Sequence, residues 1–423
     1  MDKHITLLLK KGIWIYFILL IFEGALRKWV LPSLSTPLLV IRDPFAIWIL
    51  ITAYKYGIYK PNLYVIVSFF VVAVSLFTTI LIGHGNIYVA LYGARIFVIH
   101  FPLMFLIGRV LDKQDVLQIG YVILWIVLPM TLLMAFQFYS PQSAWVNKGI
   151  GDDNEGGGFS GAMGYFRPPG TFSFINGLTL FYSLAASFIF YFWLDNKLKK
   201  AKKMLLVAST ICLFIAIPLS ISRTLLFQVG LTVIFTAVAV GRNPKYISRL
   251  VFFIITVTIL LSLLNNQSFF KTGIEVFNDR FQSANESEGG IISVFNRVFG
   301  GAFNVFGSES LPFFGYGIGV GTNVGAMLTT GRISFLFAEM EWGRLLAEFG
   351  LLLGGTIIWV RALLIIKISI ASLKQLKYNN FLPWFLLSFG FYTILQGQWA
   401  QPTALGFAIF SGGIIISSLK SIN

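Results

Sequence analysis

Long apolar runs recur from one end of the chain to the other, with short polar stretches between them. Each run has about 17–22 residues, enough for one helix to cross about 30 Å of hydrocarbon. We therefore predict an all-α fold, a polytopic membrane helix bundle with about 12 transmembrane helices. Their approximate spans are 13–31, 35–54, 62–82, 87–108, 117–138, 174–194, 204–221, 224–240, 249–264, 344–366, 381–397 and 402–419.

The composition agrees with this pattern. Of the 423 residues, 57% are hydrophobic and 12% are charged, which excludes an ordinary soluble globular chain. The first apolar run lacks a small-residue cleavage site and is followed by another run, so we expect a retained helix and not a signal peptide. The single cysteine, Cys212, lies inside an apolar run, so no intramolecular disulfide is expected.

Lysine and arginine fill alternate connections between the predicted helices. Because short loops rich in these residues stay in the cytoplasm, the alternation predicts that both termini are cytoplasmic. The cytoplasmic set then holds 19 of the 32 basic residues. It contains 16 lysines and 3 arginines, whereas the other set contains 10 arginines and 3 lysines.

This surplus of arginine is informative, because membrane topology needs only positive charge. A guanidinium group binds phosphate or carboxylate through a planar fork that lysine lacks. We therefore expect an anionic ligand at the outer face of the membrane. The alternative is that each arginine pairs with a nearby carboxylate or a lipid phosphate. The ten are Arg27, Arg42, Arg95, Arg167, Arg223, Arg280, Arg297, Arg332, Arg344 and Arg361.

Two segments between the predicted helices are long. They divide the chain into residues 1–138 with helices 1 to 5, a loop at 139–173, residues 174–264 with helices 6 to 9, a large loop at 265–343, and residues 344–423 with helices 10 to 12. The first loop combines a flexible "GDDNEGGG" with a stiff "RPPG" turn. In the second, "FFKTGIEVFNDRFQSANE" and "GGIISVFNRVFGGAFNVF" show the apolar spacing of short amphipathic helices at a membrane surface.

Charged side chains within or beside the first predicted helices are candidates for the anion site. Glu23 and Arg27 are four residues apart, a spacing typical of an ion pair on one helix face, and Lys28 lies beside them. Arg95 and His100 lie inside the fourth predicted helix. They are five residues apart, so we expect poor alignment on one helix face, and the sequence names no partner for either.

A second candidate is Arg223, between Ser222 and Thr224 in "PLSISRTLL". Two predicted helices meet there with almost no loop, which would hold the guanidinium rigidly at the level of the lipid headgroups. Such an arginine suits a lipid-linked phosphate, or it serves only as a snorkelling anchor.

A third candidate region follows the large loop. "FFGYGIGVGTN" (313–323) lacks the Lys-Ser/Thr of a phosphate loop, so we interpret it as a close-packed turn. Beyond it, Glu341, Arg344 and Glu348 fall on one face of a helix, with Glu339 a half-turn earlier. They form either an internal stripe of ion pairs or a site in which a carboxylate acts as general base.

Three of these motifs, in order over residues 200–355, resemble the bacterial O-antigen ligase and polymerase family: "SISRT", "GYGIGVGTN" and "RLLAEFGLLLG". The segments "EGALRKW" and "RPPGTF" also resemble uncharacterised members. The resemblance implies a multi-pass glycosyltransferase of the bacterial inner membrane whose donor is a glycan on polyprenyl pyrophosphate, with no metal, nucleotide or other cofactor. It implies that the 265–343 loop is periplasmic and that Arg223 contacts the pyrophosphate. Where ligases have a His-Asn pair, this chain has Glu339-Met340, which favours a polymerase.

The predicted function is therefore polymerisation of lipid-linked repeat units into surface polysaccharide on the periplasmic face. The expected partners are the polyprenyl-pyrophosphate-linked glycan, membrane lipid, and flippase and chain-length regulator proteins, without nucleic acid. The alternatives are an O-antigen ligase, a flippase of lipid-linked sugars and a scaffold for export. The predicted catalytic residues are Glu339 or Glu341 as base and Arg223, and the predicted substrate-binding residues are Arg167, Arg223, Arg332, Arg344, Arg27 and Lys28.

Overall fold

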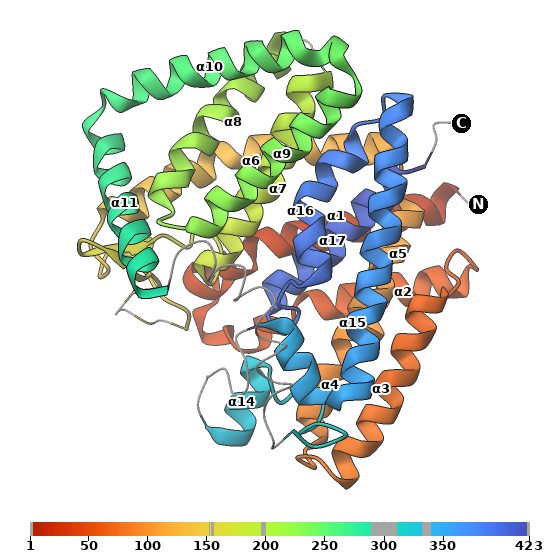
Figure 1. Ribbon diagram of the computed structural model, residues 1–423. Helices are drawn as coiled ribbons and strands as arrows, with labels where there is room; N and C mark the ends of the chain where they lie inside the picture. The colour runs from red at the N-terminus through yellow and green to blue at the C-terminus, as the bar shows by residue number, and fades with distance from the viewer. Residues whose placement is uncertain are drawn as a thin grey trace.

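The described part of the protein is mostly helical, as the computed structural model in Figure 1 shows. The structure describes residues 3–151, 153, 156–195, 200–288, 311–331 and 340–420. About 79% is helix, which confirms the predicted all-α class, and the strands are β1 (Phe159–Ala162) and β2 (Tyr165–Arg167). The α-helices are α1 (Lys3–Ala25), α2 (Arg42–Lys55), α3 (Leu63–Leu81), α4 (Ile87–Arg95), α5 (Phe101–Val110), α6 (Lys113–Tyr139), α7 (Ile175–Asp195), α8 (Lys200–Leu219), α9 (Arg223–Arg242), α10 (Ile247–Asn265), α11 (Ser268–Glu288), α14 (Asn323–Thr330), α15 (Glu341–Gln375), α16 (Leu382–Leu395) and α17 (Pro402–Ser418).

Shorter helical turns join or extend these helices. Two are π-helical, η1 (Leu26–Val30) directly after α1 and η4 (Ile96–His100) between α4 and α5. The 3-10 turns are η2 (Pro32–Leu34), η3 (Pro37–Val40), η5 (Trp145–Asn147), η6 (Pro244–Tyr246) and η8 (Leu376–Tyr378).

Ten helical segments of the described chain are long and apolar enough to cross a membrane. They correspond to ten of the predicted spans, and α16 and α17 are shorter apolar helices of 14 and 17 residues. At 1.5 Å per residue these two reach about 21 and 25 Å, less than the roughly 30 Å of a hydrocarbon core. The hairpin that they form is therefore shorter than the helices around it.

The basic connections gather at one end of the bundle, which we call the Lys-rich end. Lys10 Nζ contacts Asp112 (2.8 Å) and Asp115 (2.6 Å), and Lys420 Nζ donates to the backbone oxygens of Arg109 (2.7 Å) and Leu111 (2.8 Å). Both chain ends lie on this side of the molecule in Figure 1. The arginine-containing segments that follow α1 and α8 lie toward the opposite end of the bundle.

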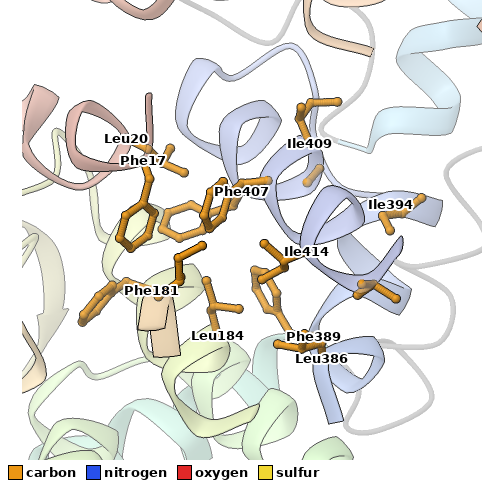
Figure 2. Close-up of a cluster of buried hydrophobic side chains, with 14 of the residues drawn as sticks. Phe17, Leu20, Phe181, Leu184, Leu386, Phe389, Ile394, Phe407, Ile409 and Ile414 are labelled. Carbon is orange, nitrogen blue, oxygen red and sulfur yellow. The ribbon is translucent and has the colours of Figure 1, made fainter. Parts of the chain in front are cut away.

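The core of the bundle is built around α16 and α17. Figure 2 shows Phe17 of α1, Phe181 of α7, Phe389 of α16 and Phe407 of α17 converging in a layer of buried apolar side chains. Phe17 itself stacks on Phe410, with ring centres 4.7 Å apart. The α16–α17 hairpin is thus enclosed by other helices, so its tip lies inside the protein.

The two long loops differ in part from the prediction. The 139–173 segment is not only flexible chain, because β1 and β2 form an antiparallel hairpin in which Phe159 pairs with Arg167. In the second segment, "FFKTGIEVFNDRFQSANE" is helical, as predicted, but as one 21-residue helix, α11. The predicted helix at "GGIISVFNRVFGGAFNVF" lies outside the described residues.

Candidate functional site

Two groups of buried charged side chains lie toward the end opposite the Lys-rich end. The first, which we call the N-terminal ionic cluster, comprises Glu23, Arg27, Lys28, Arg42, Asp43, Arg95 and His100. The second, the α15 ionic cluster, comprises Glu341, Arg344, Glu348 and Arg361. All but Asp43 are buried, which is expensive for charged groups unless each is paired or hydrogen-bonded.

In the N-terminal ionic cluster, Glu23 holds two arginines. Its carboxylate lies 3.7 Å from Arg27 Nη1 and 3.2 Å from Arg42 Nε. The expected i,i+4 pair with Arg27 is therefore present. The closer partner, Arg42, belongs to the next helix, α2. The sequence analysis did not predict this pair.

Asp43 holds Arg95 and His100, and here the prediction of poor alignment was wrong. Arg95 Nη1 lies 2.8 Å and His100 Nε2 2.9 Å from the Asp43 carboxylate, while His100 Nδ1 lies 3.1 Å from the Tyr16 hydroxyl. The reason is the π-helical turn η4, in which hydrogen bonds join residues five apart and bring such residues onto one face. The other π-helical turn, η1, contains Arg27 and Lys28, and π-turns are frequent at functional sites.

The segments "EGALRKW" and "RPPGTF" pack directly against each other. Lys28 Nζ donates to the Gly170 carbonyl (2.7 Å), Arg27 Nη1 to Ser173 Oγ (2.9 Å), and Thr171 Oγ1 to the Ile21 carbonyl (2.8 Å). A Cβ at Gly24 would overlap the backbone of residues 171–173, so glycine there allows the close approach. The stiff turn after Arg167 thus forms one wall of the N-terminal ionic cluster.

This cluster carries more cations than carboxylates. The four basic groups Arg27, Lys28, Arg42 and Arg95 stand against the two carboxylates Glu23 and Asp43. Lys28 forms no ion pair within the described part of the chain, where its Nζ donates a hydrogen bond to the Gly170 carbonyl and lies over the Trp29 ring. Two buried nitrogens, Arg42 Nη1 and Arg95 Nε, have no hydrogen-bond partner among the described residues. The arrangement is suited to receive an anionic group.

The α15 ionic cluster is balanced. Arg344 donates Nε and Nη2 to the two oxygens of Glu341 (3.0 and 2.9 Å) and Nη1 to Glu348 (2.6 Å). Arg361 Nη1 lies 2.8 Å from Glu341 Oε1. Of the two alternatives that the sequence left open for this face, the stripe of ion pairs is present. Both Glu341 oxygens accept from arginines, which favours the ionised carboxylate and disfavours a role as a proton acceptor.

The tip of the α16–α17 hairpin, residues 395–402, connects the two clusters. Arg361 donates to the carbonyls of Ile394 (2.8 Å) and Gly397 (2.9 Å), and Arg42 Nη2 donates to the Pro402 carbonyl (2.6 Å). The Trp399 side chain is fully buried, with its ring 3.9 Å from the Arg361 guanidinium. Sequence reasoning missed this tip. The available signal was "LQGQWAQP", a polar stretch with one tryptophan inside an apolar region.

The glycine-rich segment 313–323 packs between α4 and α15, as its interpretation as a close-packed turn required. Gly321 N donates to Glu348 Oε1 (2.8 Å), and Tyr316 N donates to the Ala347 carbonyl (2.8 Å). Gly315 has φ 73°, and a Cβ there would overlap the backbone of Gly350. Gly350 itself interrupts α15 with φ 74° and ψ 176°, so the two glycines form one kinked junction.

Arg223 is the first residue of α9 and is a member of neither ionic cluster as defined above. Ile221, two residues before Arg223, has φ 49°. This conformation is unfavourable for a β-branched side chain, so the turn is constrained. A Cβ at Gly161 of β1 would lie 2.6 Å from Ile221, so the β-hairpin that ends at Arg167 packs on this turn. The predicted rigid α8–α9 junction is present, and the hairpin covers it.

The remaining predicted site residues, Arg332 and Glu339, lie outside the described residues. Of the others, the structure groups Arg27 with Lys28, groups Glu341 with Arg344, and places Arg223 near the β-hairpin of Arg167. A scan of protein-family models and searches of curated proteins and of solved structures found no match to this chain.

Proposed function

We propose that this chain is a glycosyltransferase of the bacterial inner membrane that polymerises lipid-linked oligosaccharide repeat units into surface polysaccharide on the periplasmic face. The donor is a glycan carried on polyprenyl pyrophosphate, and both termini are cytoplasmic. The observation that supports it best is the cationic excess of the N-terminal ionic cluster. A buried group of cations with too few carboxylates favours an anionic partner, and a lipid-linked pyrophosphate reaches such a site from within the membrane.

The reaction is a single displacement at the anomeric carbon. An acceptor sugar hydroxyl forms a new C–O bond, the bond from the anomeric carbon to the pyrophosphate oxygen breaks, and the hydroxyl proton passes to a carboxylate base. The leaving pyrophosphate takes the electron pair, and arginines neutralise its growing charge. The pyrophosphate ester supplies the driving force, so the proposal requires no further cofactor.

The chain's own residues take the following roles in this proposal. Arg223 contacts the pyrophosphate, assisted by Arg167 at the neighbouring β-hairpin, while Arg27 and Lys28 attract the same pyrophosphate. Glu339 is the preferred base, because Glu341 is held between two arginines. Arg344, whose donors are already occupied by Glu341 and Glu348, supports the site without contacting substrate.

The test is the size distribution of surface polysaccharide and of its lipid-linked intermediates in cells with wild type, a gene deletion or Arg223→Ala at equal expression. Arg242→Ala is the matched control, because Arg242 ends the same helix α9 at the Lys-rich end. We expect single repeat units to accumulate at the periplasmic face in the deletion and in Arg223→Ala, with normal polymer in Arg242→Ala.

Other outcomes identify the alternatives. Intermediates that remain at the cytoplasmic face in the deletion would assign the protein to lipid-linked sugar translocation. Polymer of normal length that is not attached to lipid A would assign it to ligation. Normal polymer in every strain would refute the proposal.

A further inference from the structure

An exposed tryptophan lies next to the N-terminal ionic cluster on a rigid support. Trp145 is 68% exposed and stacks on Trp29, with ring centres 5.6 Å apart and planes at 30°. Trp29 Nε1 donates to the Trp145 carbonyl (3.0 Å), so backbone and ring are both fixed. We propose that the face of Trp145 is a carbohydrate subsite that stacks on a sugar ring of the lipid-linked glycan, an inference that rests on the proposed function.

The support below Trp145 is built from polar groups that are otherwise costly to bury. Asn147 is buried, and its Nδ2 donates to the carbonyls of Gln137 (3.1 Å), Ser140 (3.0 Å) and Pro141 (3.0 Å). Gln137 Nε2 in turn donates to the Val146 carbonyl (2.9 Å). These bonds hold the turn η5 in one conformation, so a ligand would meet a preorganised surface.

The same side chains connect this turn to the cationic excess. Gln137 also contacts Gly170, accepting from its N–H (2.7 Å), and Gly170 accepts from Lys28. Lys28 Nζ lies 4.4 Å from the Trp29 ring. In a glycosyl pyrophosphate one oxygen joins the sugar ring to the phosphate, so a phosphate at Arg27 and Lys28 places the first sugars close to Trp145.

The chemistry of an indole face fits a sugar. The C–H groups on one face of a pyranose carry partial positive charge, and the face of an aromatic ring is negative. A tryptophan that only anchored the protein at the membrane interface would not need the stacked partner or the buried asparagine beneath it. A lipid-linked glycan as ligand therefore explains three features together: the fixed position of Trp145, its exposed face and the basic side chains beside it.

The experiment uses the full chain in nanodiscs and, as probe, repeat-unit oligosaccharide released by mild acid from the surface polysaccharide of the organism that carries the gene. Saturation-transfer NMR reports affinity and the sugar protons in contact. The variants are Trp145→Ala, Trp145→Phe, which keeps an aromatic face, and the control Trp125→Ala, whose side chain is 64% exposed on α6.

We expect Trp145→Ala to weaken binding about 3- to 10-fold, the effect of losing one aromatic contact. Trp145→Phe should retain most of the affinity, and Trp125→Ala should match the wild type. Equal binding by wild type and Trp145→Ala, or no binding by the wild type, would overturn the subsite. If the wild type binds but the gene deletion leaves polymer unchanged, the subsite stands and the proposed polymerase function fails.

Discussion

Gly406 of α17 gives a sharp test of how the N-terminal ionic cluster is held. A Cβ at this position would overlap Arg42 Nη1 and lie 2.5 Å from Leu20 Cδ1. An arginine tip usually moves aside at little cost, but Arg42 is buried and held by Glu23, by the Pro402 carbonyl and by the Tyr16 ring. Gly406→Ala should therefore destabilise the protein.

The magnitude follows from two limits. If Arg42 keeps its ion pair and the helices separate slightly, overpacking costs about 1–3 kcal/mol. If Arg42 leaves, Glu23 loses a buried partner, which costs about 3–5 kcal/mol. The gain from replacing a helical glycine by alanine, about 0.5–1 kcal/mol, offsets only part of either cost.

The assay is thermal unfolding in a single detergent, followed by size-exclusion chromatography of the soluble fraction. Gly355→Ala on α15 is the control, because a Cβ there meets nothing within 4 Å. We expect Gly406→Ala to unfold at a lower temperature than wild type and Gly355→Ala at the same or a higher one. Equal stability of the two variants would refute the packing of Arg42 against α17.

Three further changes test separate features. Glu341→Gln leaves the buried Arg361 without a carboxylate partner and leaves Arg344 with Glu348 alone, so it should destabilise the protein by about 3–5 kcal/mol in thermal unfolding. A variant that is stable but inactive would instead indicate a catalytic base. Gly315→Ala and Gly331→Ala both place alanine at φ 73°, but only the Cβ of Ala at 315 would overlap neighbouring backbone atoms. Only Gly315→Ala should therefore lack a folded peak in size-exclusion chromatography. Equal yields of folded protein from the two variants would contradict the close junction between Gly315 and α15. Partial burial raises the pKa of Asp112 while bonds to Lys10 and to a backbone N–H lower it more, so the net pKa lies below its ordinary value. Its stabilising effect is therefore present above the unfolded pKa, near about 3.9, and is lost as pH falls through the lower folded pKa. Lys10→Met should reduce this acid sensitivity in unfolding scans below about pH 4, and an unchanged acid profile would show that the ion pair contributes nothing.

The helices and the grouping of basic loops were predictable because both depend on local sequence. A helix that crosses hydrocarbon needs a continuous apolar run, and alternating lysines mark the connections at one end. The pair of Glu23 and Arg27 was predictable for the same reason, since i,i+4 spacing is a property of a single helix. The stripe at Glu341 follows the same rule.

The candidate site was less predictable, because its main contacts join distant segments. Nothing near Arg42 in the sequence indicates that it meets Glu23 and the end of the α16–α17 tip. The pairing of Arg95 with His100 depends on a π-turn, which hydrophobic periodicity does not show. Trp399 is another case, since its burial follows from the short length of the α16–α17 hairpin and not from any local motif.

The π-turn η4 has a consequence beyond the charges at its ends. Such a turn accommodates one residue more than the α-helix on either side, so it acts like a single-residue insertion within a longer helix. Each residue of an α-helix advances about 100° around its axis, so one extra residue rotates everything that follows by that angle. Met104 and Ile107 of α5 contact Gly412 and Gly413 of α17 in the rotated register. If the unchanged segment 96–100 ran as uninterrupted α-helix, Arg95 and His100 would therefore separate, and α5 would also turn away from the glycines that it packs against.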